Sequence, residues 1–230
     1  MGNFFNNFDW SIVIDKLSAI IPALICITFH ELSHGFTAYR LGDDTAKKMG
    51  RLTLNPIKHI DIFGLIMMVL FKFGWAKPVP VNMYKFKRPK WYMAITAIAG
   101  PLSNIILAVI VLFIYGLVLG PLSTMRAQGV AEIISNIIFL TAYISVALAV
   151  FNLIPIPPLD GSKVLFSLLP SNAYFKLMKY ERYGMILLFL FINLDTFLDM
   201  NIFGGTIGRL TGSLFDSLFN ITIATFNLVN

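Results

Sequence analysis

Long apolar stretches separated by short basic loops dominate the hydropathy pattern of the chain. The stretches 91–119 and 131–153 are each long enough to cross a ~30 Å hydrocarbon core as helices. The same pattern predicts a first spanning helix over 10–41 and a further one over 183–199. We therefore predict an all-α polytopic membrane protein, a helical bundle that forms a single integral membrane domain over 1–230.

Three other segments have patterns that differ from those of the spanning helices. The apolar run within 62–73 is shorter than the ~20 residues that a spanning helix needs, so it predicts a re-entrant segment. Residues 74–84 contain two prolines and alternate in polarity at their start, which favours an extended edge segment. Over 206–228, apolar residues recur at helical spacing among polar ones, which predicts an amphipathic helix on the membrane or the bundle.

The composition agrees with a membrane protein. Of the 230 residues, 57% are hydrophobic and 13% are charged, whereas about a quarter of the residues in soluble domains are charged. The net charge of +6 comes from loops between apolar segments, so membrane topology explains it without nucleic-acid binding. The single cysteine, Cys26, excludes an internal disulfide and a multi-cysteine metal cluster, so a metal site must use histidines and carboxylates.

The segment His30-Glu31-Leu32-Ser33-His34 has the HExxH pattern. Residues four apart share one face of a helix, so the two imidazoles can bind one Zn²⁺ while Glu31 reaches a water on the metal. Ionisable groups inside a membrane helix are costly and indicate function. The alternative, two helix histidines that make polar contacts alone, leaves that cost unexplained.

A zinc site with two histidines needs a third protein ligand. The candidates are the other histidine and six aspartates, namely Asp43, Asp44, His59, Asp61, Asp160, Asp195 and Asp199. Asp160 is favoured because prolines end the preceding helix near membrane depth, where irregular backbone must line a cavity or lie within protein. If 62–73 only dips into the membrane, Asp160 and His34 lie on the same side, together with the basic loops.

Four motifs follow one another in a fixed order. They are HELSH at 30–34, GWAKPVPVN at 74–82, AGPLSN at 99–104 and NLIPIPPLDG at 152–161. Together they resemble the signatures of the site-2 protease family of intramembrane zinc metalloproteases. The resemblance implies one Zn²⁺ per chain, held by His30, His34 and Asp160. It also implies that Glu31 is the catalytic base and that Asn152 lies near the substrate carbonyl.

The resemblance also implies a membrane-associated β-hairpin or strand beside the cleft, within 74–84. The residues predicted to bind substrate are Lys77, Pro78, Val79, Pro80, Val81, Asn82 and Asn104. For Asn104, a helix-packing amide is an open alternative. Residues 120–129 are too few for the PDZ domain that some larger relatives carry, so the implied form is compact. The implied reaction is hydrolysis of peptide bonds in or near the transmembrane segments of single-span proteins.

Two alternative functions stay open at this point. A membrane ion or proton transporter would use the His, Glu and Asp cluster as its path, and a catalytically inactive homologue would bind zinc without hydrolysis. The expected partners are a transmembrane protein substrate and the lipid bilayer, without nucleic acid; the oligomeric state is open. The small size of the chain and the resemblance imply a prokaryotic cell membrane, and the basic loops predict an active site nearer its cytoplasmic side.

Overall fold

The computed structural model describes residues 10–71, 74–123, 128–198 and 200–226, and most of them are helical. The α-helices are α2 (Trp10–Arg40), α3 (Thr45–Lys48), α4 (Ile62–Phe71), α5 (Pro89–Ser123), α6 (Gln128–Asn152), α7 (Asp160–Ser167), α8 (Ser171–Tyr180), α9 (Gly184–Phe197) and α10 (Gly208–Phe226). Shorter turns are η1 (Pro56–His59), η2 (Met83–Lys85), η3 (Glu181–Tyr183) and the π-helical η4 (Ile202–Ile207). The described residues are mostly helical and contain no strand, which confirms the predicted helical fold for this part of the chain.

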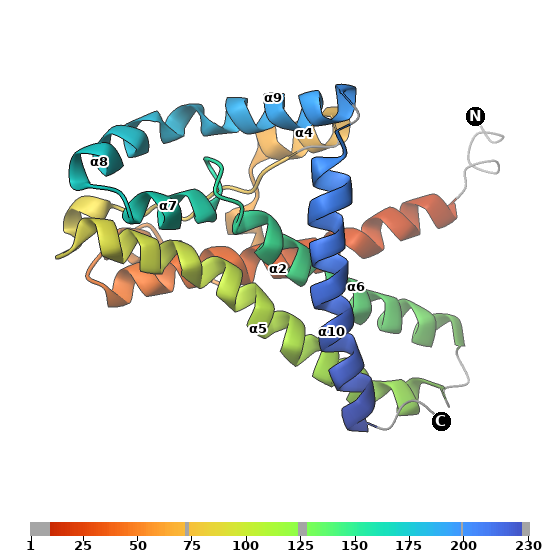
Figure 1. Ribbon diagram of the computed structural model, residues 1–230. Coiled ribbons are helices and arrows are strands. Elements are labelled where there is room, and N and C mark those ends of the chain that lie inside the picture. Colours follow the sequence, from red (N-terminus) through yellow and green to blue (C-terminus); the bar gives the residue numbers. More distant parts are fainter. Residues whose placement is uncertain (1–9, 72–73, 124–127, 199, 227–230) are drawn as a thin grey trace, which may run out of the picture.

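The centre of the molecule is a bundle of α2, α5 and α6, with α7 against α5 and α10 across α5 and α6 (Figure 1). A buried apolar cluster joins three of these helices; its members are Ala108 and Leu112 of α5, Ala142 and Val146 of α6, and Phe215 of α10. Alanines on facing helices allow close backbone approach, which is how helices pack when lipid surrounds them.

Among the described residues, two helices are long and apolar enough to cross a membrane, Pro89–Val118 within α5 and Gly129–Asn152 within α6. On α5, large apolar side chains four or three residues apart are half exposed, including Leu102, Ile106, Ile110 and Phe113. An exposed apolar face of this length suits contact with lipid. Helix α9, where we predicted a further span, has 14 residues and rises about 21 Å, less than a ~30 Å hydrocarbon core. That span stays a prediction.

The β-hairpin or strand predicted within 74–84 is not present, because the described residues contain no strand and this segment is irregular before η2. The physical reason is that side chains take up its backbone hydrogen bonds. The Val79 N–H donates to Oε2 of Glu31 over 2.7 Å. The Asn82 N–H donates to Oδ2 of Asp43 over 2.6 Å.

The carbonyl groups of the same segment are also bound by a side chain. Nη2 of Arg51 donates to the Lys77 carbonyl over 2.9 Å and lies 3.3 Å from the Pro78 carbonyl. Pro78 and Pro80 have no N–H to donate to a neighbouring strand. Residues 77–82, called the 77–82 segment below, therefore have no regular secondary structure and are not part of a sheet.

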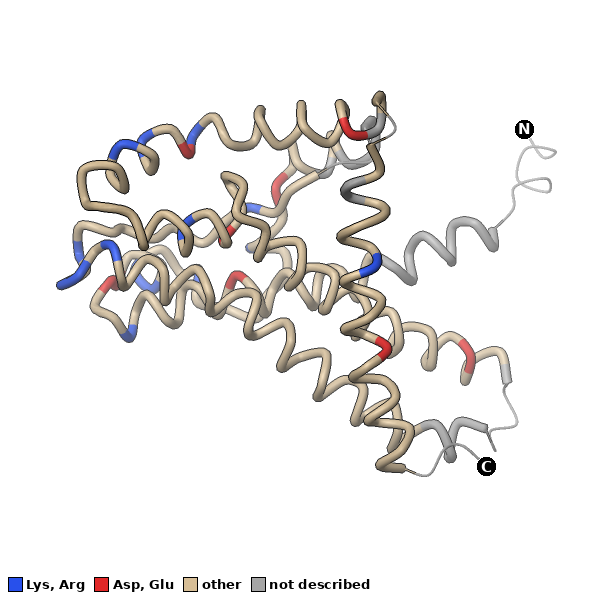
Figure 2. Tube along the Cα trace, in the orientation of Figure 1, with Lys and Arg blue, Asp and Glu red and all other residues tan. Residues whose placement is uncertain are grey.

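Most lysines and arginines lie at the end of the molecule that α3, the start of α5 and α8 form (Figure 2). The loops that contain these residues are far apart in the sequence, and the fold brings them to the same end. Basic residues collect on the cytoplasmic side of membrane proteins. This clustering of basic residues agrees with the predicted topology. The orientation of the protein in a membrane stays a prediction.

Candidate metal centre

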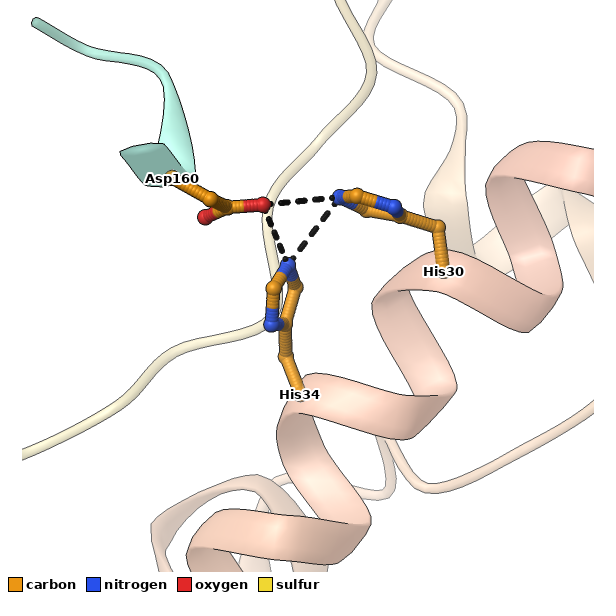
Figure 3. A group of neighbouring side chains, drawn as sticks. All are labelled: His30, His34 and Asp160. Atoms are coloured by element: carbon orange, nitrogen blue, oxygen red, sulfur yellow. Dashed lines mark hydrogen bonds and ion pairs between the residues drawn. The ribbon is translucent and has the colours of Figure 1, made fainter. Parts of the chain in front are cut away.

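Three side chains converge from two helices (Figure 3). His30 and His34 lie one turn apart on α2, and Asp160 is the first residue of α7. Oδ2 of Asp160 lies 3.1 Å from Nε2 of each histidine. The two Nε2 atoms lie 3.0 Å apart. The three side chains are 6 to 9% exposed, so the group is closed off from most of the surroundings.

The geometry of the group fits a small divalent cation. Tetrahedral ligands of Zn²⁺, each at ~2.0–2.1 Å from the ion, lie about 3.3 Å from one another. The distances of 3.0 to 3.1 Å between the three ligand atoms are close to that value. Oδ2 of Asp160 is also buried without a hydrogen-bond donor, and a buried oxygen of this kind calls for a partner. A metal ion between the three atoms would be that partner.

The chain reaches Asp160 through a tight turn after α6. Gly161 is essential to this turn, because a Cβ there would lie 2.1 Å from the Leu153 carbonyl oxygen. Oδ1 of Asp160 lies 3.4 Å from Nζ of Lys163. The same Nζ lies 3.2 Å from Oε1 of Glu181 in η3. Lys163 thus links the aspartate to the segment that leads into α9.

Helix α5 supports both imidazoles with one face. Nδ1 of His34 donates to the Thr96 carbonyl over 2.7 Å, since a carbonyl can only accept. That leaves Nε2 of His34 without a proton and free to bind a metal. Gly100 follows one turn later, and a Cβ there would lie 2.5 Å from the His34 ring and 2.7 Å from the His30 ring. Asn104, a further turn along, lies beside His30.

Comparison with known proteins identifies the family. The sequence profile of peptidase family M50 matches residues 18–120 and 116–192, which include all three converging side chains. The chain belongs to peptidase family M50, the site-2 protease family. The resemblance stated above is therefore confirmed, and membership of this family, together with the apolar helices, indicates a membrane protein.

Relatives in bacteria and archaea bear provisional names as zinc metalloproteases. YwhC of Bacillus subtilis is 44% identical over 173 residues, 73% of this chain and 76% of YwhC. Rip2 of Mycolicibacterium smegmatis is 29% identical over 171 residues, 71% of this chain and 62% of Rip2. MJ0611 of Methanocaldococcus jannaschii is 33% identical over 159 residues, 69% of this chain and 73% of MJ0611. No solved structure matches the chain.

Glu31 of the HExxH motif lies beside the first histidine and contacts the 77–82 segment. Its Oε2 accepts the Val79 N–H. The segment can lie this close to α2 because residue 35 is glycine; a Cβ on Gly35 would lie 2.8 Å from Cγ1 of Val79. The segment predicted to bind substrate is thus in contact with the glutamate of the HExxH motif.

The two asparagines with predicted roles occupy different environments. Asn152, at the end of α6, is half buried, and its Nδ2 donates to the Leu148 carbonyl of its own helix over 2.9 Å. Asn104 is completely buried, with Nδ2 3.4 Å from Nδ1 of His30. Asn104 therefore lies behind a predicted metal ligand, which agrees with the packing alternative for this residue. Roles in catalysis or substrate binding stay predictions for both.

The other candidates for a third ligand have different contacts. Asp43 accepts from the Asn82 N–H, and Asp61 accepts from the Gly64 N–H at the start of α4. His59 lies with Nε2 3.0 Å from the Thr53 carbonyl. Asp199 lies outside the described residues. Among the described residues, only His30, His34 and Asp160 form a group that could hold a metal ion.

Sequence reasoning gave no role to Arg51 or Lys163. Both lie in basic loops, where a charged side chain is usually solvated, so the sequence did not distinguish them from their neighbours. Arg51 is 7% exposed, and such burial of an arginine depends on partners that are distant in sequence. One available signal was the position of Lys163, three residues after Asp160, at a spacing where helix side chains meet.

Proposed function

We propose that this M50 chain is an intramembrane zinc endopeptidase that hydrolyses peptide bonds in or near the transmembrane segments of single-span membrane proteins. The observation that carries the proposal is the convergence of His30, His34 and Asp160 with the geometry of a metal site. The site lies next to α5 and α6, the two helices suited to cross a membrane. Family membership supports the metalloprotease chemistry.

One Zn²⁺ per chain is the proposed cofactor, and His30, His34 and Asp160 would hold it. Two nitrogens and one carboxylate oxygen leave a fourth position open, as catalytic rather than structural zinc requires. When bound, zinc supplies a Lewis acid that polarises a carbonyl group and makes water acidic enough to lose a proton near neutral pH. The names of the relatives agree with this choice of metal.

Glu31 is the proposed general base. It would accept a proton from the attacking water and then donate it to the nitrogen of the leaving amine. Its Oε2 already accepts the Val79 N–H over 2.7 Å. This hydrogen bond holds Oε2, and Oε1 is the oxygen proposed to exchange the proton.

Asn152 is the proposed donor to the oxyanion that develops on the scissile carbonyl. It lies eight residues before Asp160, at the point where α6 ends. In the structure its amide donates to the Leu148 carbonyl, so a side-chain rotation must accompany this role.

The 77–82 segment is the proposed docking edge for substrate. A transmembrane helix hides its peptide bonds within its own hydrogen bonds, so it must unwind before cleavage and then needs new partners. The backbone groups of the segment that Glu31, Asp43 and Arg51 do not already bind offer such partners by pairing with the unwound stretch. The contact between Val79 and Glu31 would place that stretch beside the catalytic group.

Parallel assays of the wild type and Glu31→Gln test the proposal. The full chain is purified in detergent, zinc per chain is measured, and cleavage of a single-span test protein is followed. We expect about one zinc in both proteins and cleavage by the wild type alone, because glutamine keeps the shape of the side chain but cannot accept the proton.

The other outcomes favour other functions. Zinc in both proteins without cleavage by either would favour the inactive homologue. Absence of zinc from both would remove the metal site and favour the ion or proton transporter, which vesicle flux assays would test. Cleavage of soluble proteins alone would contradict the proposed substrate class.

The proposed location is a prokaryotic cell membrane, with the basic end and the site toward the cytoplasm.

A further inference from the structure

The two histidines of the metal centre receive unequal support from α5. Nδ1 of His34 donates to a backbone carbonyl, that of Thr96. Nδ1 of His30 faces the side-chain amide of Asn104, with Nδ2 at 3.4 Å. Asn104 is 0% exposed, and its Oδ1 is buried without a hydrogen-bond partner.

The orientation of this amide matters for metal binding. With Nδ2 toward His30, a donor faces Nδ1, and the ring can accept only if its proton is on Nε2. A proton on Nε2 of His30 would point at the space between the three ligand atoms and block binding there. The reverse tautomer, with the proton on Nδ1, requires an acceptor beside Nδ1.

Rotation of the Asn104 amide by 180° supplies that acceptor. The amide nitrogen and oxygen are nearly equal in size, so the rotation exchanges their places without a change in packing. The backbone around Asn104 does not need to move. Its carbonyl accepts from Oγ of Ser145 on α6 over 2.8 Å, and both residues are completely buried.

We infer that Asn104 is a positioning residue whose side-chain oxygen accepts the Nδ1–H of His30 and keeps Nε2 of His30 free for the metal. The inference rests on the proposed zinc site. Thr96, Gly100 and Asn104 are spaced four residues apart on α5, and each serves the histidines differently. Thr96 orients His34, Gly100 gives both rings room, and Asn104 orients His30.

Zinc affinity tests whether the side chain at position 104 must accept a hydrogen bond from His30. The dissociation constant is measured by competition with a chelator on the full chain in detergent, for the wild type, Asn104→Asp and Asn104→Leu. Aspartate can accept from His30 but cannot donate, so we expect its affinity within about threefold of the wild type or tighter. Leucine fills the space without accepting, and we expect binding about 10 to 100-fold weaker.

Asn193→Leu is the matched control. It makes the same substitution at an exposed asparagine of α9, whose Nδ2 donates to the Phe189 carbonyl of its own helix and which has no part in the metal centre. Its zinc affinity should equal that of the wild type. An Asn104→Leu variant that binds zinc as tightly as the wild type would overturn the inference, and so would an Asn104→Asp variant that binds as weakly as Asn104→Leu.

A measurement on the unaltered chain avoids any folding defect of the variants. In the zinc-loaded protein with ¹⁵N-labelled histidine, long-range imidazole spectra should show His30 with a proton on Nδ1 and the metal on Nε2. Metal on Nδ1, or Nδ1 without a proton, would overturn the inference while leaving the proposed function intact. Absence of zinc from the wild type would instead remove the proposed function and this inference together.

Discussion

The two sides of α2 are joined to the rest of the molecule in different ways. Where α2 faces α5, the contacts to the histidines come from one helix and use a backbone carbonyl and a buried amide. Around Glu31, the 77–82 segment has no regular structure, and the side chains of Glu31, Asp43 and Arg51 bind its backbone.

This difference indicates a division between rigid and adjustable parts. A site built on packed helices keeps its ligand atoms in place, because moving one of them would disturb a whole core. A segment bound by a few side chains can shift by breaking one hydrogen bond at a time. We therefore expect substitutions on the α5 side to affect metal binding, and substitutions under the 77–82 segment to affect turnover.

The largest effect should follow from Gly100→Ala on the rigid side. The added Cβ would lie 2.5 Å from Cε1 and Nε2 of His34, so the rings must move out of the positions that bind metal. We expect zinc affinity to fall by about 100-fold or more and the free energy of unfolding to fall by about 1–3 kcal/mol. Chelator competition and thermal unfolding in detergent measure the two quantities.

Gly212→Ala is the control for this substitution. Gly212 lies within α10, and no atom lies within 4 Å of the Cβ that alanine would add. Zinc affinity should not change, and the free energy of unfolding should rise by about 0.5–1 kcal/mol. Equal zinc affinities for the two alanine variants would contradict the claim that α5 packs against the ligands without spare room.

The sequence predicted the rigid side well, for identifiable physical reasons. The helices α5 and α6 could be predicted because each contains an apolar stretch without interruption that is long enough to cross the bilayer. The pairing of His30 with His34 follows from a spacing of four, which helix geometry fixes. Asp160 required an argument about membrane topology, since seven side chains were candidates before the fold brought one of them to the histidines.

The adjustable side was predicted less well, since its contacts join residues distant in sequence. Alternating residues and two prolines near 74–84 indicated an extended segment in preference to a helix, and residues 74–82 form no helix. The predicted β-hairpin was wrong because Arg51 and Asp43 bind backbone groups that a partner strand would have used. The sequence alone does not show whether a charged loop residue is solvated or buried.

A moderate effect should follow from replacing Arg51 on the adjustable side. Arg51→Met removes the donor to the Lys77 and Pro78 carbonyls. Losing a hydrogen bond from a charged group costs about 1.5–3 kcal/mol, so we expect kcat/KM to fall by about 10 to 100-fold. Zinc per chain should equal that of the wild type. The assay is cleavage of the single-span test protein, with zinc measured on the same samples.

Two further variants sharpen this result. Arg51→Lys keeps the charge but has no planar fork for two carbonyls, so its kcat/KM should lie between those of Arg51→Met and the wild type. Arg40→Gln changes an exposed arginine at the end of α2 and should leave kcat/KM within about twofold. Loss of zinc from Arg51→Met would show that the two sides of α2 are not separable.

The smallest effect concerns the loop beyond the end of α2, where Asp44 lies 2.5 Å from Nζ of both Lys48 and Lys85. Hydrogen bonds from Lys48 and then Lys85 lower the pKa of Asp44 from 3.8 to about 2. A carboxylate with a lowered pKa in the folded state stabilises the fold above its unfolded pKa, and this stabilisation is lost as the pH falls through the folded pKa.

Asp44→Asn removes this titration and is the comparison that isolates it. The wild type should unfold at a higher temperature than Asp44→Asn at pH 5, and the difference should shrink between pH 3.8 and about 2. Salt should reduce the difference, since these side chains are exposed to solvent. Asp44 is not one of the three side chains of the metal centre, so zinc affinity should stay the same in both proteins. A pH-independent difference would mean that Asp44 stabilises the loop through packing and not through its charge.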